Sequence, residues 1–199
     1  MRSKVWAPLC ALLILTAALT AGCGSSDDSS SSSAAKAVGN PTDRAFVAEM
    51  IPHHRSAVEM AAVAKSEATS TFVKDLAADI TRTQNEEIGE MQRIDAQLGE
   101  ADIEKGDLGM EAHAMGMDSS ADELRGAKPF DEKFIAMMVP HHEGAIEMAR
   151  VELDKGENPE LKKLAKNIIS AQQREIKEMR AHAKGGEAMD EMSSEDHSG

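Results

Sequence analysis

The chain is short of aromatic residues and of cysteine. It has no tyrosine, its one tryptophan is Trp6, and only four phenylalanines occur among its 199 residues. Both cysteines, Cys10 and Cys23, lie in an N-terminal segment that has the features of an export signal. A mature domain that follows this segment has no disulfide, and a cysteine nucleophile is excluded. A metal site in that domain must therefore use histidine, methionine, aspartate or glutamate.

Cations are also few. The chain has 22 lysine and arginine residues against 35 aspartate and glutamate residues, which gives a formal net charge of −13. Removal of Arg2 and Lys4 with the export signal makes the remainder more acidic by two charges. An acidic protein repels phosphate backbones, so nucleic acid is not an expected partner. The acidity suits cation binding, although it is also an ordinary way to keep a protein soluble.

The first 22 residues predict a lipoprotein signal peptide. Arg2 and Lys4 precede an apolar run from Val5 to Leu19, which is too short to be a good membrane span. The sequence "LTAGC" resembles the lipobox of bacterial lipoproteins, with Thr20 where leucine is usual, and Cys23 is the expected lipidated residue. The Ser-rich stretch 23–40 is typical of a flexible tether. The predicted location is therefore extracytoplasmic, anchored by lipid to the cell membrane; the alternatives are a secreted or periplasmic protein and an uncleaved anchor.

One motif occurs twice. "EMIPHHRSAVEMA" starts at Glu49 and "MMVPHHEGAIEMA" at Met137, so that equivalent residues differ by 88 in number. The same offset, without a gap, relates "QNEEIGEM" (84–91) to "QQREIKEM" (172–179). A match of this length indicates an internal duplication.

Each repeat is predicted to form two helices. Apolar residues recur at helical spacing from about Thr42 to Glu67, and Ser70 can cap a second helix. In the second repeat, Asn158 followed by Pro159 is a strong helix start. Two hairpins that bury their apolar faces together predict an all-α, ferritin-like four-helix bundle over residues 41–184. Its repeats span 41–97 and 129–184, a long crossover loop spans 98–128, and residues 185–199 form a polar tail.

The repeated motif offers soft metal ligands. Imidazole binds several transition metals, and thioether sulfur is selective for Cu(I). The candidate ligands of the two helices are Met50, His53, His54 and Met60, with Met138, His141, His142 and Met148. The crossover loop adds Met110, His113, Met115 and Met117. A methionine stripe is more often core than ligand, and the recurring Glu87 and Glu175 are read as a solvated face. The sequence leaves open whether the repeats form one shared site or two.

These motifs resemble a known bacterial family. "FVAEMIPHHRSAVEMA" and "FIAMMVPHHEGAIEMAR", each followed by Q-x-x-E-I-x-E-M, are similar to the "domain of unknown function 305" family, which is grouped with ferritin-like folds. The resemblance covers roughly Pro41 to Ala183. It implies an extracytoplasmic four-helix bundle, with some members similar to periplasmic copper-binding proteins. By that resemblance, the methionines and histidines of the two motifs are the expected ligands.

The leading hypothesis is a non-catalytic lipoprotein that binds Cu(I), or another transition metal, for sequestration or transfer. Its expected partners are the metal ion, the membrane and other copper-handling envelope proteins; a homo-oligomer is also considered. One alternative is a ferritin-like dinuclear metal oxidoreductase, but such sites use Glu-x-x-His. Here Glu49 precedes His53 by four residues, and its counterpart is Met137. The other alternative is an envelope interaction module that binds no metal.

Overall fold

The computed structural model describes residues 38–195, with side chains as far as residue 185. The predicted signal peptide, the lipidation site Cys23 and nearly all of the predicted tether lie outside the described residues. Four α-helices follow in order: α1 (Pro41–Glu67), α2 (Thr71–Glu100), α3 (Phe130–Lys155) and α4 (Pro159–Glu195). A short 3-10 helix, η1 (Ala121–Glu123), lies in the crossover loop. The described residues contain no strand, and the predicted all-α four-helix bundle is confirmed.

The helices begin where the sequence predicts. The Ser70 side chain accepts a hydrogen bond from the Val73 amide, and the Asn158 side chain accepts from the amides of Glu160 and Leu161. These caps satisfy amide groups that have no partner within the first turn of a helix. At the start of α1, Asn40 and Asp43 form a reciprocal capping box.

An aspartate in the first turn of each hairpin accepts hydrogen bonds from the turn that joins the two helices of the other hairpin. Asp43, in the first turn of α1, accepts hydrogen bonds from the amides of Glu157 and Asn158, between α3 and α4. Its counterpart Asp131, in the first turn of α3, accepts from the amides of Thr69 and Ser70, between α1 and α2. The duplication is therefore visible as a reciprocal contact, with each repeat closing the other at one end of the bundle.

The bundle contains two hydrophobic clusters rather than one continuous core. The first includes Met60, Phe134 and Met138, and the second includes Phe46, Met50 and Met148. Each cluster draws on all four helices, and the buried histidines and glutamines belong to neither. A polar layer thus separates two apolar halves.

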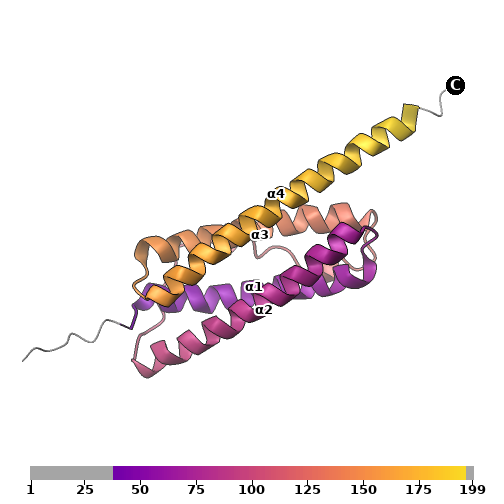
Figure 1. Ribbon diagram of the computed structural model, residues 1–199. Helices are drawn as coiled ribbons and strands as arrows, with labels where there is room; N and C mark the ends of the chain where they lie inside the picture. The colour runs from indigo at the N-terminus through magenta and orange to yellow at the C-terminus, as the bar shows by residue number, and fades with distance from the viewer. Residues whose placement is uncertain (1–37, 196–199) are drawn as a thin grey trace, which may run out of the picture. The chain divides into compact units, whose positions relative to one another are not determined.

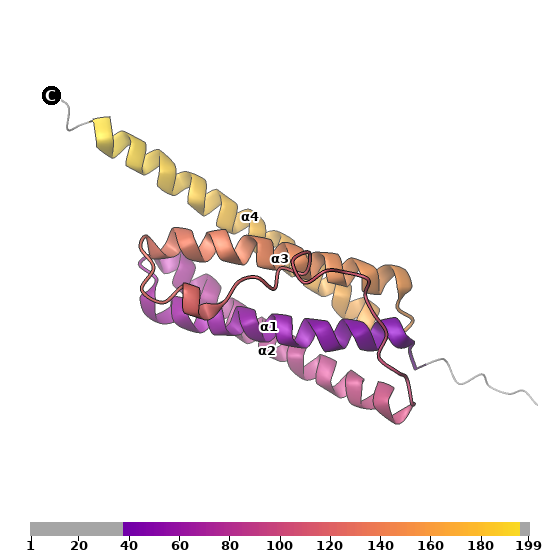
Figure 2. The same cartoon turned by 180° about the vertical axis from the view of Figure 1, so that it is seen from behind.

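The crossover loop and α4 differ from the sequence-based prediction in detail. The loop runs along α1 and α3, on the side away from α2 and α4 (Figure 2). Helix α4 continues to Glu195, past the bundle, where the sequence predicted a polar tail from Gly185 (Figure 1). Residues 187–192 are mostly good helix formers, which explains the continuation despite the two glycines before them. Over residues 38–195, no helix has the length and apolar character that crossing a membrane requires.

Candidate functional site

The polar layer at the middle of the bundle brings the two repeated motifs together. All four motif histidines are fully buried, at 0% exposure. His53 of α1 and His141 of α3 stack face to face, with ring centroids 3.7 Å apart and an interplanar angle of 17°. Two buried glutamines, Gln84 on α2 and Gln172 on α4, are equivalent in the two repeats. The sequence left open whether the repeats form one shared site or two, and the structure places the histidines of both motifs in one layer.

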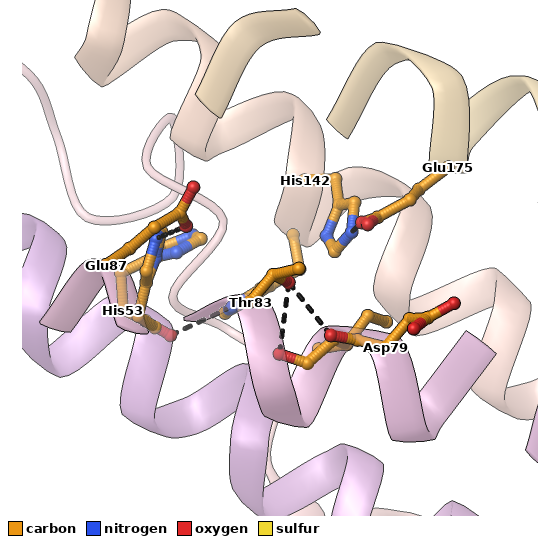
Figure 3. A network of polar contacts seen from close by, with 9 residues as sticks. His53, Asp79, Thr83, Glu87, His142 and Glu175 are labelled. Carbon is orange, nitrogen blue, oxygen red and sulfur yellow. Dashed lines mark hydrogen bonds and ion pairs between the residues drawn. The ribbon is translucent and has the colours of Figure 1, made fainter. Parts of the chain in front are cut away.

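The second histidine of each pair points to a glutamate on the other helix of its own hairpin. His54 Nε2 lies 2.8 Å from Glu87 Oε2, and His142 Nε2 lies 2.6 Å from Glu175 Oε2. Figure 3 shows His142 directed at Glu175, and Glu87 in the corresponding place of the other repeat. When Nε2 donates its hydrogen to the carboxylate, Nδ1 of a neutral ring keeps its lone pair. Among the described residues, Nδ1 of both rings is buried without a hydrogen-bond partner.

The stacked histidines differ from each other. Neither ring nitrogen of His53 has a hydrogen-bond partner within the described chain. His141 lies between two carbonyl oxygens, with Nδ1 2.9 Å from Gly116 O and Nε2 3.1 Å from His53 O. A neutral imidazole has one N–H and can donate to only one of them at a time. The crossover loop, through Gly116, therefore contacts the buried layer directly.

Burial keeps both stacked rings uncharged at neutral pH. It is the largest cause that lowers the pKa of His53 well below 6.5, and the neighbouring histidines lower it further. Burial, followed by the nearby His142, lowers the pKa of His141 to about 4, although the two carbonyl contacts oppose the shift. Neutral imidazole is the form that ligates a metal ion. His53 and His141 can therefore ligate a metal ion without first releasing a proton.

The motif methionines flank this layer. Met50, Met60, Met138 and Met148 are each at 0% exposure. Met50 and Met148 pack in one hydrophobic cluster, and Met60 and Met138 in the other. They therefore serve as core residues, and thioether sulfur is adaptable enough to do this and still face a soft ion. Between residues 38 and 195, no three side chains of histidine, cysteine, aspartate or glutamate form a ready metal-binding group.

The loop candidates are spread out rather than gathered. His113 is exposed and interacts with Asp118, Met117 is 37% exposed, and Met110 and Met115 are half-buried against the second cluster. The loop approaches α3 closely at Gly144, where an added Cβ would lie 2.1 Å from Met115 O. A cavity of about 360 Å³ between loop and helix is lined by His113, Asp118, Glu143 and Glu147, among others. The loop reaches a motif histidine through the carbonyl oxygen of Gly116, which forms a hydrogen bond with His141. None of the predicted loop ligands forms a hydrogen bond from its side chain to a motif histidine among the described residues.

Sequence reasoning missed the glutamates and glutamines of the layer as functional residues. Glu87 and Glu175 recur at the same offset as the histidines, and Gln84 and Gln172 precede each by three residues. A spacing of three residues on a helix places both on one face. The repeated pattern Q-x-x-E was therefore the available signal, but the same pattern on a single helix is equally typical of a solvated face.

Comparisons with known proteins agree with this architecture. The model of a family described as "Domain of unknown function (DUF305)" matches residues 43–183. CopM in its Cu(I)-bound form is 34% identical, with a TM-score of 0.60, over 72% of this chain and 96% of that chain. CopM structures in Cu(II)-bound and Ag-bound forms give similar matches.

Two further relatives were found. A DUF305 fragment from Deinococcus radiodurans is 30% identical, with a TM-score of 0.60, over 72% of this chain and 95% of that one. Uncharacterized protein L153 of Acanthamoeba polyphaga mimivirus is 41% identical over 49 residues, or 25% of this chain. This match spans only 32% of the viral protein.

Proposed function

This chain belongs to the DUF305 family, and we propose that it is an extracytoplasmic copper-binding protein. It captures Cu(I) through the histidines and methionines of its two motifs, without catalysis, and retains or transfers the ion. Support comes from three sources: the soft donor set, the copper-bound forms of the related CopM, and the export signal in the sequence. The histidine–glutamate pairs carry the proposal.

Each pair has the arrangement in which a carboxylate supports a metal-ligating histidine. A histidine that ligates a metal ordinarily donates its other ring hydrogen to a carboxylate, which fixes the tautomer and raises the basicity of the ligating nitrogen. Glu87 and Glu175 are placed to do this for His54 and His142. The buried Nδ1 atoms carry an energetic cost of about 1–3 kcal/mol each when left without a partner. A soft cation that accepted these lone pairs would remove that cost.

The alternatives receive less support. A ferritin-like dinuclear centre uses Glu-x-x-His, and no glutamate stands three residues before a motif histidine in either repeat. An interaction module that binds no metal explains the glutamate partners of the buried Nε2 atoms, but not the Nδ1 atoms of His54 and His142 that lack a partner among the described residues.

The test is an anaerobic Cu(I) competition titration of the full chain against a chromophoric chelator. The double variant His54→Ala, His142→Ala should lose tight binding. Because cavities at buried sites can unfold a protein, the near-isosteric pair Glu87→Gln, Glu175→Gln is measured beside it. We expect the glutamine double variant to bind Cu(I) about 10–100-fold more weakly, because a carboxylate that accepts from a ligating histidine usually contributes that much to metal affinity. Circular dichroism checks that each variant remains helical.

A loop variant separates the two groups of candidate ligands. Met110, Met115 and Met117 are changed to leucine, which preserves apolar volume. If the histidine variant binds Cu(I) as the wild-type chain does and the loop variant does not, the copper site lies in the loop and not in the polar layer. Failure of the wild-type chain to bind Cu(I) would reject the copper proposal and favour the interaction module.

A further inference from the structure

The outward face of α4 carries a basic stripe, which we define as Lys163, Lys166, Arg174, Lys177, Arg180 and Lys184. All six side chains are exposed. At 100° per residue they fall within an arc of about 120°, and the stripe is about 32 Å long. Within residues 38–185, only Arg180 of the six takes part in an ion pair, with Glu143. Up to residue 185, the exposed acids of α4, Glu160 and Glu178, fall about 40° outside this arc.

The duplicated helix α2 shows that the stripe is not a feature of the fold. The equivalent positions on α2 are occupied by Asp75, Ala78, Glu86, Gly89, Gln92 and Ala96. None is a cation and two are acids. Helix α2 has three cations and seven acids, whereas α4 up to residue 185 has seven cations and three acids. Two helices with the same place in the core thus present opposite charge to their surroundings.

A groove beside the stripe gives the cations a concave setting. It lies between α3 and α4, has a volume of about 780 Å³, and is lined by Lys177, Arg180 and Lys184 of the stripe, with Arg150 from α3. Two acids also line it: Glu143 pairs with Arg180, and Glu147 pairs with Arg150. Lys177 and Lys184 remain to meet an anion. Ile146 and Ile176 add apolar surface to the same groove.

The chain leaves the bundle next to the beginning of this stripe. Asn158, which caps α4, donates a hydrogen bond from Nδ2 to Val38 O at 2.6 Å, and Asn40 Nδ2 donates to Lys155 O at 2.8 Å. Val38 is one of two large apolar residues that are exposed among the described residues. Cys23, the expected lipid anchor, precedes Val38 by 15 residues. Such a segment reaches at most about 50 Å, so an anchored chain keeps the stripe within reach of the membrane.

We propose that the basic stripe of α4 docks the bundle on a membrane surface rich in anionic phospholipid. Each lysine or arginine near such a surface contributes favourably, and the attraction acts only within about a Debye length. The acidic crossover loop lies on the side of the bundle away from α4, so its negative charge does not cancel a local contact at the stripe. A lipid chain combined with a basic patch is an effective anchoring pair. This proposal is independent of copper binding.

The test uses the mature chain, residues 23–199, with Cys23→Ser so that no lipid anchor contributes, in sedimentation with vesicles of phosphatidylcholine, with or without phosphatidylglycerol. The stripe variant is Lys166→Glu, Lys177→Glu, Lys184→Glu. The matched control is Lys65→Glu, Lys74→Glu, Lys133→Glu, three exposed lysines elsewhere that are also outside any described ion pair and give the same change in net charge. We expect at least tenfold weaker binding of the stripe variant to phosphatidylglycerol vesicles, and a change of no more than about threefold for the control.

Several outcomes would overturn the proposal. Equal losses in both variants would show that net charge, and not the stripe, decides binding. Equal binding of the wild-type chain to both vesicle types, or no loss of binding in 0.5 M salt, would show that the contact is not electrostatic. Binding of poly-glutamate that depends on the stripe, without binding to phosphatidylglycerol, would assign the stripe to an acidic protein partner instead. Circular dichroism of all three proteins confirms that the variants are folded.

Discussion

The two repeats can be compared position by position because the same 88-residue offset relates them throughout the bundle. They agree in the histidine–glutamate pairs of the polar layer and in the aspartates that close each end. They differ around those aspartates and on their outer faces. Ala64 and Ala68 of the first repeat correspond to Glu152 and Gly156 of the second. Duplication has thus preserved the polar layer, whereas the packing around the closing aspartate Asp43 has diverged from that around Asp131.

Gly156, which has no side chain, leaves room for the Glu152 carboxyl group. Glu152 is fully buried, and a Cβ at Gly156 would lie 2.2 Å from Glu152 Oε1. Burial, and then the neighbouring Asp43, raise the pKa of Glu152 to about 9, although Lys162 opposes the shift. The second repeat therefore contains a carboxyl group that stays protonated at neutral pH, where the first repeat has two alanines.

The largest expected difference between the repeats is the pH dependence of stability that Glu152 confers on the second repeat. Above the ordinary pKa of 4.5, the unfolded chain loses the Glu152 proton, while the folded chain keeps it up to about pH 9. Stability therefore falls as the pH rises through this window, with a slope of up to about 1.4 kcal/mol per unit. Glu152→Gln should flatten the decline between pH 6 and 8, measured by urea unfolding. A wild-type chain equally stable at both pH values would show that Glu152 is charged or solvated.

The aspartates provide the next comparison. Asp43 is fully buried beside Glu152, whereas Asp131 is partly exposed. Burial raises the pKa of Asp131, but hydrogen bonds from Ser70 and Thr69 outweigh it and hold that pKa below 3.8. Because buried donors cannot turn to water, we expect Asp43→Ala to cost about 3 kcal/mol and Asp131→Ala about 1.5 kcal/mol in urea unfolding. Equal losses of unfolding free energy in the two variants would mean that burial does not make the Asp43 contacts more stabilising than the Asp131 contacts.

Much of the fold followed from the sequence, and particular residues show why the rest did not. The offset of 88 and the caps at Ser70 and Asn158 predicted the hairpins, since both signals are local. The partners of His54 and His142 were not predicted, because helical spacing does not say which neighbour a glutamate meets. The contact of Gly116 with His141 depends on the path of a loop that has no periodicity. The basic stripe was hidden by a net charge of −13.

The smallest expected difference between the repeats concerns their contacts with the crossover loop. It tests whether the loop packs more tightly on the second motif than on the first. Gly144 and Ser56 are equivalent, but Gly144 lies against the Met115 carbonyl, while Ser56 Oγ donates a long hydrogen bond of 3.3 Å to Ser119 O. We expect Gly144→Ala to cost about 2 kcal/mol, because backbone must move to admit the methyl group. Ser56→Ala should cost about 0.5 kcal/mol. Urea unfolding measures both.

Limited trypsin digestion can locate the effect of Gly144→Ala, because Lys105 and Arg125 lie in the same loop. If the loop is held on α3 at Gly144, the added methyl group displaces it, and cleavage at these two residues should become faster than in Ser56→Ala. Such displacement would also release His141 from Gly116 O. Unchanged cleavage with unchanged stability would show that the loop moves aside for the methyl group without cost.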